Sequence, residues 1–270
     1  LRPTPTLVGV HDTIAENYPE LAFASRKHER FWRAKVRLAL WQADRCLTVS
    51  HYSKRCIEAT YGYPAAKIDV VPEAASPIFT PGGDEREDFL LYVGGISPSK
   101  NLGALLEAFA GLENATSATR LVLVGDYRGD RFRGCYEELE KASQELGVAD
   151  RVEFAGYVPD EGLVELYRRA RLFVMPSFDE GFGLPAAEAM TCGAPVVVSS
   201  GNALQELVGD AGLAADPRDV EALRTAMDRV LADEALAGQL AARGVRRAAG
   251  LSWDETARGV VRALESTVLA

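Results

Sequence analysis

Two glycine-containing segments of the sequence carry the residue types best suited to chemistry. In the first, Gly94 and Gly95 end an apolar run, and Lys100 stands where a helical pattern begins. Glycine lets a ligand approach the backbone closely, free N–H groups at a helix start attract anions, and lysine adds a point charge suited to phosphate. The segment therefore predicts a phosphate site, although a tight turn with Asn101 as the helix cap would give the same pattern. Its spacing is not that of the P-loop.

The second segment holds two acids, Glu180 and Glu188, around a glycine-containing junction between a strand and a helix. Residues Gly181–Gly183 can present backbone N–H groups to an anion, and Pro185 suits a first helical turn, where its missing N–H costs nothing. Carboxylates accept hydrogen bonds from vicinal hydroxyls, so the pair suits a ribose or a sugar ring. The alternatives are a solvated loop acid for Glu180 and a surface position for Glu188. Apolar neighbours favour a buried Glu188, and a buried acid needs a partner.

The elements around these segments alternate between strand-like and helix-like patterns. Such alternation predicts a doubly wound parallel sheet with helices on both faces, in which ligands bind at the carboxyl ends of the strands. Strands are expected at residues 7–10, 46–49, 68–71, 89–93, 121–124, 152–154, 172–175, 196–199 and 213–214. Helices are expected at residues 25–44, 52–61, 102–112, 135–146, 161–170, 184–191, 203–208, 220–231 and 253–269.

The same patterns predict two lobes. Residues 1–75 are expected to form the C-terminal part of one lobe, and residues 89–250 a Rossmann-like lobe. Between them, residues 76–88 have the Pro, Gly and charge content of a linker. The helix in residues 251–270 can dock on either lobe or cross back to the first. Because such a lobe usually needs on the order of 150 residues, we expect the chain to start inside a domain.

Together, several segments resemble the family 4 retaining glycosyltransferases of the GT-B fold, in particular the mannosyltransferase-like group 1 type. The resemblance extends over almost the whole chain and depends on the combination of segments. The segments that resemble the family are Glu180-x7-Glu188 with Cys192–Val197 after it, Tyr92–Leu102, Phe154–Val158, and His11–Ile14 with Tyr18–Glu20 after it. Two further segments, Val49–Ser53 and Val70–Pro72, fit the region that links the lobes.

The resemblance implies a GT-B fold, with residues 89–250 as the nucleotide-sugar-binding lobe and residues 1–75 as part of the acceptor-side lobe. It also implies roles for matching residues. The donor diphosphate would be held by Gly94, Gly95 and Lys100, and the N–H groups around Gly181, Phe182, Gly183 and Leu184 would face the phosphate and the sugar. Glu188 would bind the ribose, and Tyr157 and Val158 would seat the base. Glu180 and His11 would contact the transferred sugar near the reacting carbon.

The implied reaction moves a hexose from a GDP- or UDP-sugar to a glycan or lipid-linked acceptor, with retention of configuration. The segment His11–Ile14 favours mannose. Preorganised N–H groups and Lys100 would stabilise the departing diphosphate without a metal or other cofactor, an effect that usually dominates such catalysis. No Asp-x-Asp pair stands at a strand end, and Asp126 and Asp130 are expected to be ordinary loop acids.

The sequence departs from the family pattern in two places. Many members carry an arginine where Gly95 or Ser99 stands here, as a second cation on the diphosphate. Either another residue such as Arg128 or Arg131 replaces that cation, or the leaving group is bound more weakly. The glycine-rich loop of the first lobe, which normally closes over the donor phosphates, is missing. Activity of this stretch by itself is therefore left open.

The composition of the chain limits which kinds of partner and site the protein can have. The net charge of −9 argues against nucleic acid. No run approaches the roughly 20 apolar residues that cross a bilayer, and no signal peptide is visible. The four cysteines and three histidines have no metal-site spacing. These features predict a cytoplasmic protein with reduced thiols.

The charge is unevenly distributed along the chain. Residues 1–56 hold ten Lys/Arg and five Asp/Glu, an excess of +5, which leaves −14 for the rest. On the helix expected at 25–44, Arg26, Arg30, Arg33 and Arg37 form one stripe, with aromatic residues elsewhere on the helix. An ordinary solvated face would look the same, but such a helix can also lie peripherally on an anionic inner membrane surface.

Two other classes of protein fit parts of the pattern. An NAD(P)-dependent Rossmann oxidoreductase would share the alternation, but Gly94 and Gly95 lack the G-x-G-x-x-G spacing. A non-catalytic nucleotide-sugar-binding fragment would explain the short first lobe. A sugar-nucleotide phosphorylase or epimerase on the same fold is a related enzyme alternative.

Overall fold

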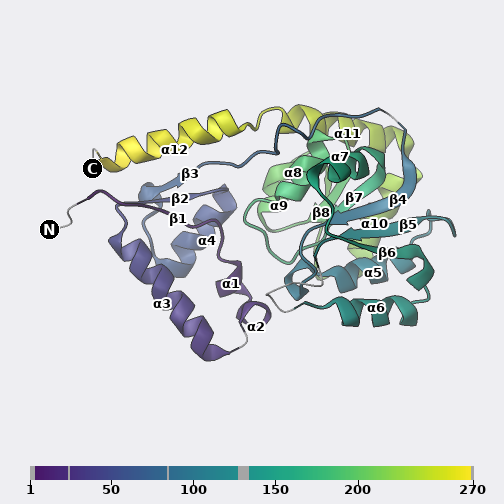
Figure 1. The fold of residues 1–270 in the computed structure, drawn as a ribbon, viewed down its shortest axis with the longest axis horizontal. Helices are drawn as coiled ribbons and strands as arrows, with labels where there is room; N and C mark the ends of the chain where they lie inside the picture. The colour runs from purple at the N-terminus through teal and green to yellow at the C-terminus, as the bar shows by residue number, and fades with distance from the viewer. Residues whose placement is uncertain (1–3, 24, 84, 127–133, 269–270) are drawn as a thin grey trace.

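The computed structural model describes residues 4–23, 25–83, 85–126 and 134–268, and these form two lobes side by side (Figure 1). The strands are β1 (Leu7–Gly9), β2 (Arg45–Thr48), β3 (Ile68–Val70), β4 (Glu87–Val93), β5 (Arg120–Val124), β6 (Val152–Gly156), β7 (Ala170–Met175), β8 (Val196–Ser199) and β9 (Leu213–Ala215). The α-helices are α1 (Ile14–Asn17), α2 (Pro19–Ala22), α3 (Arg26–Gln42), α4 (His51–Tyr61), α5 (Leu102–Ala110), α6 (Tyr136–Glu145), α7 (Asp160–Arg169), α8 (Leu184–Thr191), α9 (Ala203–Val208), α10 (Val220–Ala232), α11 (Glu234–Ala248) and α12 (Trp253–Val268). Short 3-10 turns are η1 (Ala65–Lys67), η2 (Pro98–Lys100) and η3 (Ala149–Arg151).

The second lobe is built on a six-stranded parallel sheet with the order β6-β5-β4-β7-β8-β9. The chain works outward from β4 to β6 and then returns to β7 on the other side of β4. The strand order therefore reverses between β4 and β7, and the loops after these two neighbours leave toward opposite faces. A crevice forms at such a switch point, at the carboxyl ends of the strands.

Alternation along β4 explains the two cores of this lobe. Phe89, Leu91 and Val93 belong to the core beneath α7, α8 and α9, whereas Leu90 and Tyr92 belong to the core beneath α5, α6 and α10. Successive side chains of a strand point to opposite faces, so one apolar run fills both cores. The two-sided parallel sheet predicted from the sequence is confirmed.

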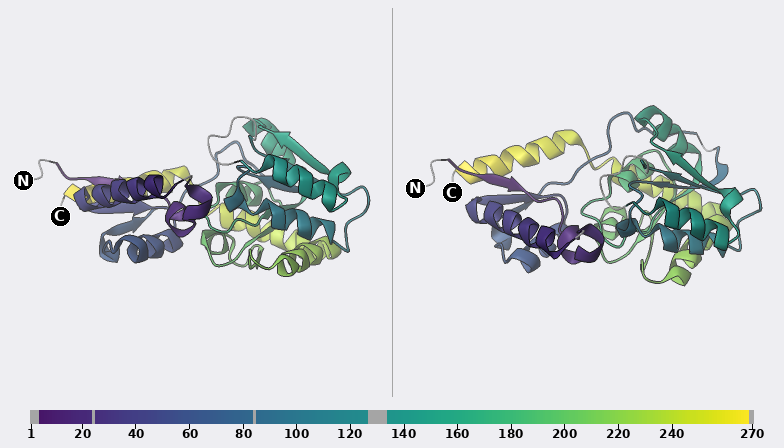
Figure 2. Two further views of the ribbon diagram at one scale, coloured as in Figure 1. Left: turned by 90° about the horizontal axis from the view of Figure 1, so that it is seen from below. Right: turned by 60° about the horizontal axis from the view of Figure 1, so that its bottom comes forward.

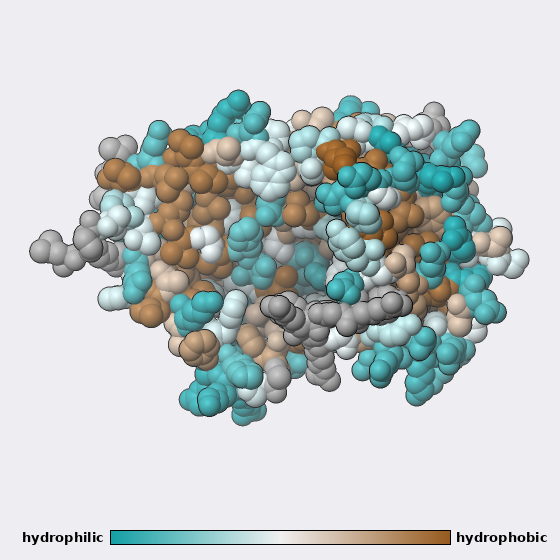
Figure 3. Space-filling model, viewed as in Figure 1, coloured by the Kyte–Doolittle hydropathy of each residue, from teal (hydrophilic) through white to brown (hydrophobic). Residues whose placement is uncertain are grey.

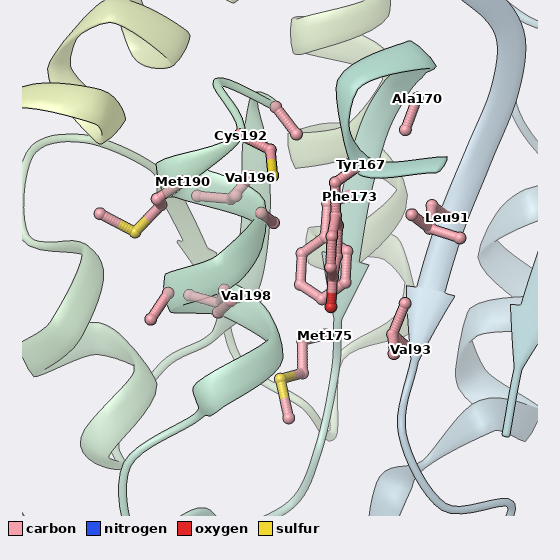
Figure 4. Packing of buried hydrophobic residues seen from close by; sticks show 14 of the residues in the cluster. Leu91, Val93, Tyr167, Ala170, Phe173, Met175, Met190, Cys192, Val196 and Val198 are labelled. Atoms are coloured by element: carbon pink, nitrogen blue, oxygen red, sulfur yellow. The ribbon is translucent and has the colours of Figure 1, made fainter. Parts of the chain in front are cut away.

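The core beneath α8 surrounds the ring of Tyr167, a tyrosine whose hydroxyl group is polar. Tyr167 of α7 packs edge-on against Phe173, with ring centroids 5.7 Å apart. Figure 4 shows its ring among Leu91, Val93 and Phe173. Buried tyrosine hydroxyls require a hydrogen-bond partner, and here the partner belongs to the candidate site described below.

The first lobe contains a three-stranded parallel sheet, β1-β2-β3. Leu40 of α3 and Ile57 of α4 pack against Cys46 and Ile68 of its strands. The C-terminal helix α12 leaves the second lobe and contacts β1 and β2 (Figure 2). A Cβ on Gly259 would lie 2.8 Å from a Val71 methyl, so this glycine lets α12 approach the end of β3 closely.

Apolar side chains remain exposed on the outer side of α12. They are Val261, Leu264 and Val268, and Figure 3 shows apolar surface gathered over this part of the first lobe. The same view shows the surface receding between the two lobes.

Some elements were not predicted. Helix α11 is absent from the expectations because its alanine-rich sequence carries a weak apolar signal; only Leu240, Gly244 and Ala248 are buried along it. Helices α1 and α2 are single turns between β1 and α3, too short for a periodic pattern.

Candidate active site

The two glycine-containing junctions meet at the carboxyl ends of β4 and β7. Lys100 Nζ lies 2.6 Å from Glu180 Oε1, and the two side chains are largely buried. The Phe178 N–H donates to the Ser99 carbonyl at 3.0 Å. The meeting follows from the sheet order, because β4 and β7 are hydrogen-bonded neighbours.

Asn101 joins the junctions a second time. Its side-chain amide donates to the carbonyls of Pro176 (3.1 Å) and Pro217 (2.7 Å). Asn101 stands at the N-cap position of α5, but its side chain makes no capping hydrogen bond, which differs from the alternative of a simple turn with Asn101 as the helix cap. It adopts a left-handed backbone with φ of 58°, and asparagine tolerates that conformation better than most residues.

The N-terminus of α8 is shaped by a glycine with positive φ. Gly183 has φ of +101°, and a Cβ there would lie 2.2 Å from the Leu204 side chain. Pro185 follows in the first turn. Phe182 is buried and Leu184 half-buried, so the loop is held in place. Pro185 has no N–H and the Ala186 N–H donates to the Gly183 carbonyl at 2.9 Å, which leaves the N–H groups of Gly183 and Leu184 for a ligand at the start of α8. Such groups, together with the helix dipole, attract an anion.

The other junction is similarly crowded. Gly94 has φ of +153°, and a Cβ there would meet the Tyr92 hydroxyl, which donates to the Gly95 carbonyl at 2.9 Å. A Cβ on Gly125, after β5, would lie 2.0 Å from the Gly94 carbonyl oxygen. Backbone therefore packs directly on backbone beside Lys100.

Glu188 lies one turn inside α8 and has a single described hydrogen-bond donor. The Tyr167 hydroxyl donates to Glu188 Oε2 at 2.9 Å. Burial raises the pKa of Glu188 to about 7; the Tyr167 hydrogen bond opposes this rise and the charge of Asp160 adds to it. A carboxyl that titrates near neutrality beside a helix start is suited to gain a hydroxyl ligand.

The first lobe reaches the same place through the segment that begins at His11. A Cβ on Gly181 would lie 2.8 Å from the His11 carbonyl oxygen and 2.9 Å from the Asp12 Cβ. Desolvation between the lobes raises the pKa of Asp12, and the nearby Glu180 carboxylate adds to the rise. The His11 side chain is 62% exposed, and its Nδ1 lies 3.5 Å from Glu73 Oε1.

The residues expected to seat a base lie further along the edge of the sheet. Gly156 ends β6 with φ of +69°, and its carbonyl accepts from the Gly125 N–H at 3.0 Å. Tyr157 is 78% exposed, while Val158 packs partly against the core. Among the described hydrogen bonds, Lys100 pairs with Glu180 and Glu188 with Tyr167, and none of them involves Tyr157.

Three residues with expected roles, two as a second cation for the diphosphate and one as a loop acid, lie in a part of the chain that the structure does not describe. Arg128, Arg131 and Asp130 lie outside the described residues. Among the residues that are described, no group of three or more His, Cys, Asp or Glu side chains is arranged to hold a metal ion.

Comparison with protein-family models assigns both lobes. Residues 78–247 match the model described as glycosyl transferases group 1. Residues 1–76 match the model described as glycosyltransferase family 4. The chain is a group 1 glycosyltransferase.

Curated relatives support this assignment. This glycosyltransferase is 34% identical over 265 residues to O-antigen chain mannosyltransferase B of Escherichia coli, covering 94% of this chain and 68% of the relative. It is 37% identical over 213 residues to D-inositol 3-phosphate glycosyltransferase of Frankia alni, covering 73% of this chain and 52% of the relative. The chain thus spans about two thirds of the first relative and about half of the second.

Solved structures share the fold. Sucrose-phosphate synthase of Thermosynechococcus elongatus superposes with a TM-score of 0.83 at 28% identity, covering 97% of this chain and 68% of that one. HepE of Anabaena, solved with UDP and glucose, superposes with a TM-score of 0.80 at 20% identity, covering 97% and 72%. The GT-B fold expected from the sequence is confirmed.

Several contacts at the lobe interface of the glycosyltransferase were not predicted from the sequence, although the segment Val49–Ser53 was matched to the region that links the lobes. The Glu206 carboxylate of α9 accepts from the N–H groups of His51 and Tyr52 at the start of α4, at 2.8 and 2.9 Å. The Ser53 hydroxyl donates to the Gly181 carbonyl at 3.2 Å. The side-chain amide of Asn17, in α1, donates a hydrogen bond to the Asp179 carboxylate at 2.9 Å. Their spacing carries no signal, because each pair joins segments more than 100 positions apart.

The basic stripe on α3 needs a correction. Arg33 lies against the lobe, where its guanidinium donates to Glu29 Oε1 at 2.8 Å and to the Glu16 carbonyl at 2.9 Å. Arg26, Arg30 and Arg37 are exposed. No helix in the described ranges has both the length and the apolar character needed to cross a membrane.

Proposed function

We propose that this glycosyltransferase moves a hexose, preferentially mannose, from a nucleoside-diphosphate sugar to a glycan or lipid-linked acceptor, with retention of configuration and without a metal or other cofactor. The observation that carries the proposal is the Lys100–Glu180 pair, 2.6 Å apart, at the switch point beside the start of α8. It joins a cation for phosphate to a carboxylate for sugar hydroxyls in one crevice.

The donor diphosphate is proposed to lie between Lys100 and the N-terminus of α8. Breaking the sugar–phosphate bond leaves negative charge on the diphosphate. Lys100 and the N–H groups of Gly183 and Leu184 supply positive charge there, and preorganised groups of this kind are usually the largest contribution to rate. The close approach of Leu204 to Gly183 leaves the N–H groups at the start of α8 little freedom to rearrange.

The nucleoside is proposed to extend from the diphosphate toward Glu188 and the end of β6. Glu188 would accept hydrogen bonds from the ribose hydroxyls, and the backbone near Tyr157 and Val158 would seat the base. The exposed Tyr157 ring offers a surface on which a base can stack.

The sugar is proposed to lie between Glu180 of the second lobe and His11 of the first. In the transfer step, the bond from the anomeric carbon to the phosphate oxygen breaks and its electrons stay on the diphosphate. The acceptor hydroxyl oxygen bonds to the same face of that carbon, and its proton passes to the departing phosphate. Mannose is favoured because of the His11–Ile14 segment and the mannosyltransferase of Escherichia coli to which the chain is similar.

A transfer assay tests this proposal. GDP-mannose, GDP-glucose and UDP-glucose are each incubated with a membrane extract containing glycan and lipid acceptors, in EDTA, and the anomer of the product is read by NMR. We expect transfer of the sugar with its anomeric configuration kept. We also expect Lys100→Ala to lower kcat/KM on the order of 10²–10³-fold. Inversion, a requirement for added divalent metal, or normal turnover by Lys100→Ala would contradict the proposal.

We further propose peripheral contact with an anionic membrane surface, from the cytoplasmic side. The outward side of α3 exposes Phe31 (72%), Leu38 (55%) and Trp41 (71%). Arg30 and Arg37 are exposed on the same helix. Exposed aromatic and apolar side chains flanked by cations are the features of a helix that lies in a lipid interface.

A hollow at the C-terminal end of α3 adds a place for a lipid phosphate. It has a volume of about 410 Å³ and is lined by Arg37, Trp41, Tyr61 and Lys67, among others. None of its lining residues is acidic. The hollow therefore continues the basic character of the helix onto the neighbouring turn.

Co-sedimentation with phosphatidylglycerol vesicles tests the membrane contact. We expect the wild-type chain to bind them more strongly than phosphatidylcholine vesicles, and Arg30→Gln/Arg37→Gln and Leu38→Ser/Trp41→Ser each to lose most of that binding. Arg229→Gln/Arg243→Gln, on the second lobe, is the control and should bind normally. Equal binding by all variants would contradict a role for α3.

A further inference from the structure

A buried carboxyl joins the donor loop to the first lobe. Asp179 directly precedes Glu180, and only 2% of its surface is exposed. Its Oδ2 accepts from the Asn17 side-chain amide at 2.9 Å, and the Tyr52 hydroxyl also contacts this carboxyl. Its Oδ1 has no hydrogen-bond partner among the described residues. Burying a carboxyl with incomplete hydrogen bonding costs free energy, so the site needs a reason beyond stability.

The partner of Asp179 belongs to the helix that follows the His11 segment. Asn17 is the last residue of α1, and its amide also contacts Thr13 Oγ1 at 3.3 Å. Thr13 is the neighbour of Asp12. The Asp179 carboxyl thus holds α1, and α1 continues directly from the residues proposed to face the sugar.

A separate set of contacts holds α4. Glu206 accepts from the N–H groups of His51 and Tyr52, and Ser53 donates to the Gly181 carbonyl. These bonds do not involve the Asp179 carboxyl. The Tyr52 hydroxyl of α4 also contacts the Asp179 carboxyl, so losing that carboxyl removes one contact of α4. It releases α1 and the His11 segment, whereas α4 keeps the Glu206 and Ser53 bonds that join the lobes.

We propose that Asp179 is a positioning residue, which sets His11 and Asp12 against Glu180 across the lobe interface and so controls turnover without controlling nucleotide affinity. This rests on the proposed function, in which His11 contacts the transferred sugar. In that proposal the nucleotide is bound by Lys100, α8 and Glu188 of the second lobe, and the Asp179–Asn17 hydrogen bond involves none of them. A displacement of about 1 Å at a reacting centre can cost on the order of 10²-fold in rate.

The expected behaviour of substitutions follows from the charge state of the carboxyl. Desolvation raises the pKa of Asp179, and the charge of Asp12 adds to the rise, while Asn17 and Tyr52 oppose it through their hydrogen bonds. The neutral form is thereby favoured relative to an exposed aspartate. An asparagine is neutral and keeps an oxygen for the Asn17 amide, so it should replace Asp179 better than alanine does.

The test compares Asp179→Ala, Asp179→Asn, Asn17→Ala and the double variant Asp179→Ala/Asn17→Ala, with Asp210→Ala as the exposed control. We expect kcat to fall 10- to 100-fold in the two single alanine variants and the double variant to be no worse than the worse single. Asp179→Asn should keep most of kcat. The Kd for the donor nucleotide, measured by calorimetry, should stay within about twofold of wild type in all of them.

A structural readout separates this inference from the proposed function. Hydrogen exchange should become faster in residues 13–17 of Asp179→Ala, with β4–β9 unchanged, whether or not the enzyme transfers sugar. If exchange changes as expected but no variant, wild type included, transfers sugar, the proposed function fails and the contact stands. Unchanged kcat in a folded Asp179→Ala, or a loss of nucleotide affinity parallel to the loss of kcat, would overturn the positioning role.

Discussion

Glu188 shows how neighbouring residues change the chemistry of one carboxyl. It shares α8 with Ala186, Ala187, Ala189 and Met190, all of which are buried. The helix therefore keeps water from the carboxyl, and only the Tyr167 hydroxyl replaces it within the described structure. Desolvation penalises the charged form, which is why the pKa of Glu188 is raised to about 7.

Glu188→Gln is predicted to remove a pH dependence of stability. The pKa is near 4.5 when the chain is unfolded and about 7 when it is folded. A raised carboxyl pKa stabilises the fold below about pH 4.5, and this contribution is lost as pH rises toward 7. We therefore expect Glu188→Gln to be more stable than wild type by on the order of 1–3 kcal/mol at pH 8, with little difference at pH 4.5. Urea unfolding of both proteins measures this, and a difference independent of pH would contradict it.

At the level of single residues, the sequence could predict which side chains have the right chemical groups for the site, but not which side chains they contact. Lys100 and Glu180 stand at strand-to-helix junctions, and that position was readable from apolar runs and glycines. The pairing of Glu188 with Tyr167, the burial of Asp179 and the inward turn of Arg33 depend on side chains from other elements. No spacing in one chain specifies such contacts.

Among the elements, the loop before α8 depends most on a single residue. Gly183 combines a positive φ with a close approach of Leu204, whose side chain would lie 2.2 Å from a Cβ. Any side chain there must strain the backbone and displace the Leu204 side chain of α9. The start of α8, which we propose faces the diphosphate, is therefore built on this glycine.

Gly183→Ala is predicted to destabilise the fold by about 1–3 kcal/mol, through backbone strain and the contact with Leu204. Gly103→Ala is the matched control. Gly103 lies inside α5 with open space around its Cβ position, so alanine there should stabilise by about 0.5–1 kcal/mol. Thermal or urea unfolding of both variants checks the pair. A neutral or stabilising Gly183→Ala would show that the loop does not need this glycine.

At this scale most of the fold was predictable. Apolar runs of strand length alternate with helical periods, and all nine strands of the described residues lie where such runs were found. Helix α11 was missed, although its buried residues Leu240, Gly244 and Ala248 recur every four positions, because two of the three are small and give little apolar signal. The sheet order that brings Gly95 and Gly183 together is a property of tertiary packing and follows from the rules of doubly wound sheets rather than from either segment.

For the whole molecule, α12 ties the end of the second lobe to the first. Its Thr256 hydroxyl donates to the Pro72 carbonyl at 2.7 Å, and Gly259 lies against Val71. The sequence left open which lobe this helix would join, because the fit between a glycine and a valine distant in the chain has no periodic signature. The helix therefore restrains the lobe connection from the side opposite α3.

Gly259→Leu is predicted to loosen α12 from the first lobe. Overpacking a close contact of this kind typically costs about 1–3 kcal/mol. Hydrogen exchange should become faster in β1–β3 and in α12, while β4–β9 keep their protection. Gly238→Leu, where nothing lies within 4 Å of the Cβ position, is the control. Equal exchange in the two variants would show that α12 does not depend on this approach.

The central claim is that Lys100 and the start of α8 together bind a nucleoside diphosphate without a metal. Calorimetric titration of UDP and GDP in EDTA tests it most directly, with wild type, Lys100→Ala and Lys141→Ala, an exposed lysine on α6. The account predicts that at least one nucleotide binds wild type and Lys141→Ala equally, and binds Lys100→Ala at least about tenfold more weakly, a difference of about 1.4 kcal/mol. An unchanged Kd in a folded Lys100→Ala, or binding of neither nucleotide to the wild type, would contradict the account.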